Sequence, residues 1–94
     1  MHNTAYYQNQ RLHLENVALD DIADHFGTPC FVYSKDALKQ NFLAYQNALG
    51  DQSHLICYAV KSNSNLAVLQ TLANIGAGFD IVSVGELERV LLAG

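Results

Sequence analysis

Apolar residues recur along this chain at two different spacings. Over residues 34–49, and again over residues 65–75, they fall three or four positions apart, which is typical of amphipathic helices. Residues 55–60 form instead an unbroken apolar run, as expected of a strand buried on both faces of a parallel sheet. A second short apolar run, over residues 79–82, leads into a last predicted helix that begins at Ser83. A serine or asparagine stands at the start of each of these three helices, where its side chain can act as a cap.

The order strand, helix, strand, helix from residue 55 onward decides the expected fold class. Repeated βα units predict parallel strands joined by right-handed crossovers. A closed barrel of eight such units needs roughly 250 residues. This chain has 94 residues, and it ends on Gly94, a residue type common at helix ends. The sequence therefore predicts an incomplete α/β domain that is a piece of a larger fold.

The first third of the chain has a different pattern. Residues 1–10 are polar and are expected to be frayed. Residues 11–14 alternate and predict a short strand, and residues 20–26 predict a short helix whose acidic start suits the helix dipole. Residues 27–29, Gly-Thr-Pro, end this helix. Residues 30–33 are a second strand-like run.

Composition narrows the function classes. Half of the residues are hydrophobic and 15% are charged, so the chain is expected to fold. A net charge of −4 without a basic stripe argues against nucleic acid or an anionic membrane as the partner. No apolar run approaches the ~18 residues of a membrane span, and the start does not resemble a signal peptide. Cys30 and Cys57 form no CxxC and the four histidines show no metal-ligand spacing, so we expect no disulfide, no metal and a cytoplasmic setting.

Lys61 is the leading candidate for chemistry, because it directly follows the apolar run. Alternation would place Cys57, Ala59 and Lys61 on a face of small residues, opposite a bulky face that packs against helices. Lys61 would then point into the space beside Ala59, at the C-terminal strand end where active sites of parallel α/β folds lie. Removal from water favours the neutral amine, which attacks aldehydes, as a lysine that forms an imine requires. The alternative is a lysine that leaves the strand and reaches water.

Two acidic residues complete the candidate site. Asp80 interrupts the second apolar run and alternation places it on one face with Val82. If the two strands are neighbours, Asp80 and Lys61 face one cavity; otherwise Asp80 is bonded to backbone amides or solvated at a strand end. Glu86 stands three residues after Ser83, the spacing of a capping box, which explains both residues structurally. A functional Glu86 at the mouth of a barrel is the alternative.

Two segments around these residues resemble a known family. Residues 57–65, Cys-Tyr-Ala-Val-Lys-Ser-Asn-Ser-Asn, are similar to the YAVK-x-N segment of the pyridoxal-phosphate-dependent diaminopimelate, ornithine and arginine decarboxylases. Residues 78–88, Gly-Phe-Asp-Ile-Val-Ser-Val-Gly-Glu-Leu-Glu, are similar to that family's second segment, and residues 27–33 resemble the lead-in to its barrel. The similarity runs from about residue 12 to the end of the chain and is greatest to the diaminopimelate branch.

The resemblance implies a fold and an activity. Residues 35–94 would be the first βα units of a pyridoxal-phosphate-binding, alanine-racemase-like (β/α)8 TIM barrel. Residues 1–34 would be an N-terminal segment associated with a separate β-domain. The reaction implied is the decarboxylation of the small-molecule amino acid meso-2,6-diaminopimelate to L-lysine, in lysine biosynthesis, by a cytoplasmic homodimer.

The resemblance also implies roles for single residues. Lys61 takes the position of the lysine that forms an imine with pyridoxal 5'-phosphate. Asp80 and Glu86 take the positions of two acidic residues near that lysine. The expected catalytic residues are therefore Lys61, Asp80 and Glu86, and the expected cofactor-binding residues are Lys61, Asp80 and Ala59.

Two alternatives stay open at this point. The parent enzyme could act on ornithine, arginine or carboxynorspermidine, because the family's substrate-contacting residues belong to later segments. The chain could also be an inactive truncated piece that only associates with other chains through an unpaired sheet edge. In either case the 94 residues alone are expected to be inactive, since the family's phosphate site and proton donors also belong to later segments.

Overall fold

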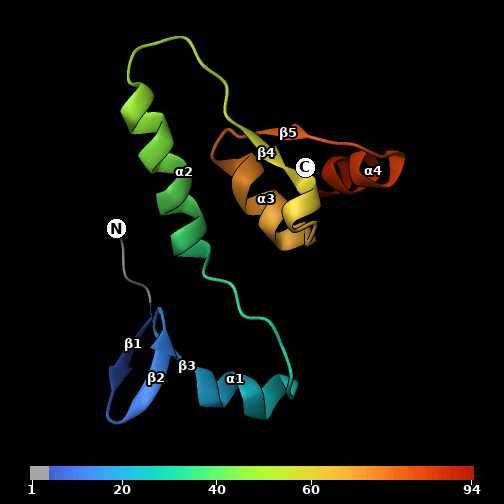
Figure 1. Ribbon diagram of the computed structural model, residues 1–94. Helices are drawn as coiled ribbons and strands as arrows, with labels where there is room; N and C mark the ends of the chain where they lie inside the picture. Colours follow the sequence, from blue (N-terminus) through green and yellow to red (C-terminus); the bar gives the residue numbers. More distant parts are fainter. Residues whose placement is uncertain (1–4) are drawn as a thin grey trace. The chain divides into compact units, whose positions relative to one another are not determined.

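The structure is a computed structural model, and it describes residues 5–94. The chain divides into two compact units, Met1–Ala37 and Leu38–Gly94, and each is described by itself. Figure 1 follows the chain through both units.

The first unit is a small antiparallel sheet followed by a helix. Strands β1 (Ala5–Gln8), β2 (Arg11–Leu14) and β3 (Val17–Ala18) pair in the order β1-β2-β3, and α1 (Leu19–Phe26) comes next. The two-residue turn between β1 and β2 has positive φ at both positions, 52° and 65°, which matches the right-handed twist of a hairpin. The predicted strand over residues 11–14 and the predicted helix over residues 20–26 are confirmed.

Two predictions for this unit are wrong. The prediction of frayed residues fails for residues 5–8, because they pair with Arg11–Leu14 and form β1; residues 1–4 lie outside the described part. The strand predicted over residues 30–33 is absent, since no described strand pairs with this segment to supply a hydrogen-bonded ladder. Phe31 there is 89% exposed, and its ring stacks at 6.4 Å on Tyr33.

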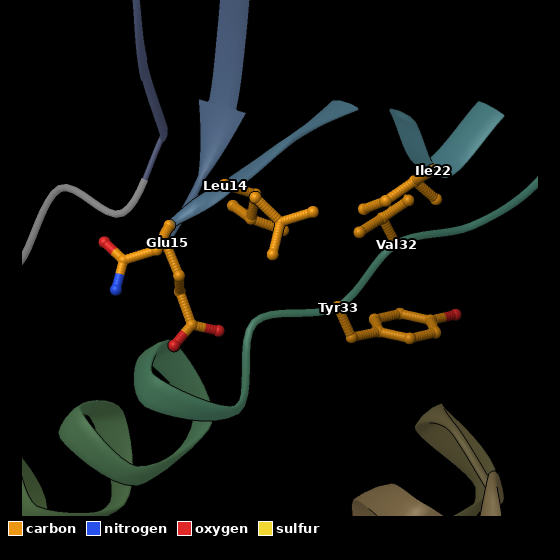
Figure 2. Close-up of a pocket in the computed structure, with 7 residues that line it drawn as sticks. Leu14, Glu15, Ile22, Val32 and Tyr33 are labelled. Atoms are coloured by element: carbon orange, nitrogen blue, oxygen red, sulfur yellow. The ribbon is translucent and has the colours of Figure 1, made fainter. Parts of the chain in front are cut away.

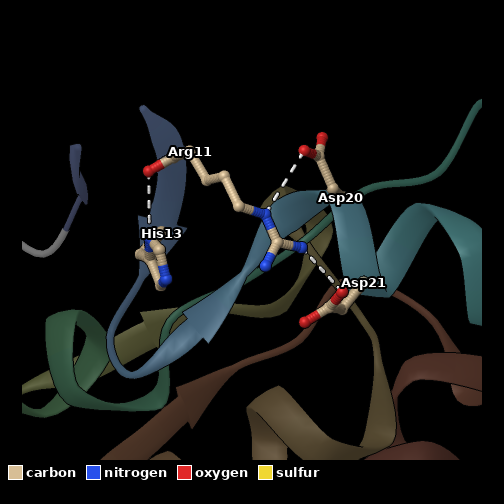
Figure 3. Close-up of polar contacts among 4 residues, drawn as sticks. All are labelled: Arg11, His13, Asp20 and Asp21. Carbon is tan, nitrogen blue, oxygen red and sulfur yellow. Dashed lines mark hydrogen bonds and ion pairs between the residues drawn. The ribbon is translucent and has the colours of Figure 1, made fainter. Parts of the chain in front are cut away.

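Exposed polar contacts connect α1 to β2 (Figure 3). Arg11 Nη2 donates to Asp21 Oδ1 at 2.7 Å, and its Nε lies 3.7 Å from Asp20 Oδ2. The hydrogen bond to the Asp21 carboxylate, with its negative charge, raises the pKa of Arg11. Both carboxylates lie in the first turn of α1, where the helix dipole also favours negative charge.

The second unit contains the predicted βα repeats. Helix α2 (Lys35–Leu49) leads into it, and strand β4 (Cys57–Ala59) is followed by the 3-10 turn η1 (Val60–Ser62) and by α3 (Leu66–Asn74). Strand β5 (Gly78–Asp80) and α4 (Val84–Ala93) complete the unit. Strands β4 and β5 pair in parallel and lie side by side in Figure 1. The α/β class and the parallel βα units predicted from the sequence are therefore confirmed.

The pairing register separates the two faces of this small sheet. Tyr58 and Phe79 are register partners, and their rings make an edge-to-face contact at 6.4 Å. Both rings pack on the two hydrophobic clusters of the unit, one formed by Phe42, Val68 and Leu72 and the other by Val60, Leu69 and Ala93. The opposite face carries the small residues Cys57, Ala59 and Gly78 together with Asp80.

Strand β4 is shorter and less covered than expected. It has three residues instead of the six in the apolar run, and Cys57 is exposed. The prediction that this strand is buried on both faces is therefore wrong. Helices pack on the face that carries Tyr58, whereas Cys57 on the small-residue face is exposed.

The first prediction concerns the core of the second unit. Leu69 is 0% exposed and packs with Val60 and Ala93, so Leu69→Ala should lower the free energy of unfolding by about 2–5 kcal/mol. Leu69→Met keeps most of the volume and should cost less than about 1.5 kcal/mol. Urea unfolding followed by circular dichroism measures both. An equal loss for the two variants would contradict the packing described.

Candidate functional site

Lys61 lies in the 3-10 turn that follows β4, and not in the strand itself. Its neighbour Val60 is completely buried, whereas Lys61 is exposed. The prediction that Lys61 continues the strand is wrong, because the extended backbone ends at Ala59 and the chain turns. The described residues do not bury Lys61, so the expected removal of its side chain from water is not observed. Its placement at the C-terminal end of a parallel strand is confirmed.

Asp80 and Ala59 are brought together by the sheet. They are register partners at the C-terminal ends of β5 and β4, so the neighbouring strands that the sequence argument required are present. Asp80 is exposed, Ala59 is half-buried, and Lys61 follows Ala59 by two residues. The structure thus places an amine and a carboxylate at the same end of one two-stranded sheet.

The small-residue face beside them is tightly spaced. A Cβ atom added at Gly78 would come within 2.9 Å of the Cys57 sulfur, and 3.5 Å from Leu55. Glycine at this position therefore lets the two strands keep this close spacing next to Ala59 and Asp80.

Glu86 has the capping role that its spacing predicts. Ser83 Oγ accepts a hydrogen bond from the Glu86 backbone N–H at 3.1 Å. Glu86 Oε1 in turn accepts from the Val82 backbone N–H at 2.9 Å, and not from the N–H of Ser83 itself. The cap is confirmed, and a further chemical role for the carboxylate stays a prediction.

The polar residues after Lys61 serve the backbone. Asn63 Oδ1 accepts from the Asn65 backbone N–H at 3.1 Å, and Asn65 Oδ1 accepts from the Ala67 backbone N–H at 2.9 Å. Asn65 is thus the N-cap of α3, as its position in the sequence indicated. These two side chains define the end of the turn that carries Lys61.

The described surface has several hollows, two of which lie in different units, and the sequence predicted neither of these two. In the first unit a cavity of about 320 Å³, shown in Figure 2, contains none of the predicted site residues; its lining is Leu14, Glu15, Asn16, Val17, Ile22, Val32 and Tyr33. In the second unit an apolar groove of about 260 Å³ runs between α2 and β4 and is bordered by Ala59. Each of these two hollows is lined by segments that are separated in the sequence, so a local sequence pattern does not predict it.

Residues 5–94 contain neither a metal-binding cluster nor a membrane-spanning helix. No group of three or more His, Cys, Asp or Glu side chains there could hold a metal ion. No helix in that part of the chain has the length and apolar character needed to cross a membrane. Cys30 and Cys57 are free thiols.

Comparison with known proteins identifies the class. Residues 35–94 match the family described as pyridoxal-dependent decarboxylase, pyridoxal binding domain. The chain belongs to this family.

Within this family, the chain is similar to proteins named diaminopimelate decarboxylase. The chain is 57% identical over 89 residues to a diaminopimelate decarboxylase of Vibrio cholerae, covering 95% of this chain and 21% of the relative. It is 55% identical over 92 residues to that of Pseudomonas aeruginosa, covering 98% of this chain and 22% of the relative. The chain therefore spans about a fifth of the length of these curated relatives.

Solved structures agree with the fold. A crystal structure from Aquifex aeolicus superposes with a TM-score of 0.90 at 45% identity, covering 97% of this chain and 22% of that one. A diaminopimelate decarboxylase from M. jannaschii in complex with L-lysine superposes with a TM-score of 0.84 at 32% identity, again covering 97% of this chain and 22% of that one.

The second prediction tests the cap that orders α4. Ser83→Ala removes the acceptor of the Glu86 N–H and should lower the free energy of unfolding by about 1 kcal/mol. Ser83→Asp supplies another good N-cap oxygen and should keep the stability within a few tenths of a kcal/mol. Urea titration of the two variants beside the wild type measures the difference. Equal stability of Ser83→Ala and wild type would show that the cap contributes nothing.

Proposed function

We propose that this chain is the N-terminal part of a diaminopimelate decarboxylase, which converts meso-2,6-diaminopimelate to L-lysine and carbon dioxide in lysine biosynthesis. The observation that carries the proposal is the position of Lys61, at the C-terminal end of a parallel strand whose neighbour ends in Asp80. The similarity to enzymes of that name, at 57% and 55% identity, supports the choice of substrate within the family.

The proposal extends to the whole enzyme. Residues 35–94 would be the first βα units of a (β/α)8 barrel, and residues 1–34 would be associated with a separate β-domain. The complete enzyme would be a homodimer in the cytoplasm. Further strands added beside β4 and β5 would continue this sheet into the barrel.

The residues of the site fit the aldehyde end of pyridoxal phosphate, the cofactor of this family. Lys61 supplies the primary amine, and the adjacent strand face carries the small residues Cys57, Ala59 and Gly78. Asp80 supplies a carboxylate on the same face. When bound, the cofactor takes up the electron pair that loss of carbon dioxide leaves on the substrate carbon.

The chain's own residues have three tasks in this scheme. Lys61 Nζ, in its neutral form, would hold the cofactor at its aldehyde carbon, and Lys61 would be an ammonium group when it is not bonded to the cofactor. Asp80 holds that ammonium by a charge-assisted hydrogen bond and so keeps the amine close for the next cycle. Ala59 has no side chain beyond Cβ and keeps the face beside them clear.

The third prediction tests Lys61 in a full-length enzyme that carries these residues. Such an enzyme is the natural protein or a chimera in which this chain precedes the part of the Vibrio cholerae relative that it does not cover. Lys61→Ala should lower lysine formation by at least about 100-fold, the scale of removing a group that acts in the chemical step. Borohydride reduction followed by mass spectrometry should attach pyridoxal phosphate to the Lys61 peptide of the wild type.

The matched control is Lys35→Ala, which removes an exposed lysine at the start of α2 and should leave activity within about two-fold, as a surface change outside the site. Full activity of Lys61→Ala, or trapping of the cofactor on another lysine, would refute the proposed role. For the natural protein, a panel with meso-diaminopimelate, ornithine, arginine and carboxynorspermidine decides the substrate, and preference for any of the last three would overturn the proposed reaction.

The fourth prediction separates the cap from the chemistry at Glu86. Glu86→Gln keeps an oxygen that can accept from Val82 N–H, so the thermal midpoint should stay within a few degrees of the wild type. Removing the negative charge should still lower kcat by about ten-fold, if the carboxylate acts on charge near Lys61. Glu86→Ala should lower both. A Gln variant with full kcat would mean that Glu86 is a capping residue only.

A further inference from the structure

The turn that carries Lys61 is held by side chains from two other elements. Tyr58 Oη, from β4, donates a hydrogen bond to the Asn63 carbonyl oxygen at 2.9 Å. Arg89 Nε, from α4, donates to the Ser64 carbonyl oxygen at 2.8 Å, across 25 residues of sequence. These two carbonyls belong to the irregular segment between η1 and α3, where no helix or strand ladder uses them.

The other end of the same turn is held by the core. Val60 is completely buried and packs with Leu69 and Ala93. Ala93 lies four residues after Arg89 on α4, so the two side chains share one face of that helix. Helix α4 therefore contacts the chain both before Lys61, at Val60, and after it, at Ser64.

We propose that Arg89 is a positioning residue for Lys61 in the reaction described above, on which this inference rests. Its guanidinium fixes the Ser64 carbonyl and thereby limits the directions in which the Lys61 side chain can leave the turn. The hydroxyl of Tyr58 does the same at Asn63, one residue earlier. Lys61 itself is exposed, so the backbone around it, and not side-chain packing, has to set its direction.

Loss of the Arg89 side chain is expected to have a local effect on the turn and not a global effect on stability. Arg89 is exposed, and a single exposed polar contact adds little to global stability, so its loss should not unfold the domain. A lysine displaced from its attacking position, in contrast, loses reaction rate steeply even for small displacements. Loss of Arg89 should therefore lower kcat while KM and the thermal midpoint stay nearly constant.

The test compares Arg89→Gln and Arg89→Lys in the full-length enzyme with Lys35→Gln, which makes the same charge change at an exposed residue of α2. In Arg89→Gln, kcat should fall about ten-fold with KM within about two-fold. In the cofactor-free protein, the peptide covering residues 61–65 should exchange its amide hydrogens about ten-fold faster. Arg89→Lys should recover part of the kcat and part of the slow amide exchange, since the lysine ammonium can donate to the same carbonyl. Lys35→Gln should change neither.

Unchanged exchange over residues 61–65 in Arg89→Gln would overturn the proposal, and so would a loss of kcat that only accompanies a lower thermal midpoint. If Arg89→Gln does not fold, Tyr58→Phe removes only the hydroxyl that holds Asn63 and must show the same faster exchange and lower kcat. A wild type that forms no lysine would refute the proposed reaction, whereas the exchange experiment would still decide whether Arg89 orders the Lys61 turn.

Discussion

The parallel register of β4 and β5 is the constraint on which the second unit depends. With Ala59 opposite Asp80, the rings of Tyr58 and Phe79 meet on the covered face and the small residues meet on the open one. A slip of β5 by one residue would turn Asp80 toward the apolar clusters and the ring of Phe79 toward the open face. Burial of the rings therefore fixes which residues the open face presents, and the candidate site is a consequence of core packing.

The backbone turns directly after the last paired residue of β4. Val60, the first residue after β4, packs with Leu69 and Ala93. The 3-10 turn keeps Val60 buried and leaves Lys61 at the end of the strand, exposed. Burial of one residue and exposure of the next are therefore produced by the same turn.

Local patterns predicted the parts of this fold that depend on local physics. The caps at Asn65 and Ser83 follow from side-chain oxygens three or fewer residues from the amides they bind, so spacing alone indicates them. The parallel pairing follows from the βα order. The end of β4 at Ala59 was missed, because it depends on a cluster to which Leu69 and Ala93 contribute from distant positions. The strand expected over residues 30–33 was wrong, because alternation cannot show whether a partner strand exists.

Helix α4 joins the structural and the chemical parts of the site. Its first turn is ordered by Glu86, Arg89 lies three residues further on, and Ala93 lies four residues after that. Residues at these spacings follow one stripe of the helix, so a rotation or translation of α4 moves all three contacts together. The small side chain of Ala93 lets the helix approach Val60 closely, which in turn brings Arg89 within reach of the Ser64 carbonyl. Helix α4 thus contacts the chain on both sides of Lys61, at Val60 through Ala93 and at Ser64 through Arg89.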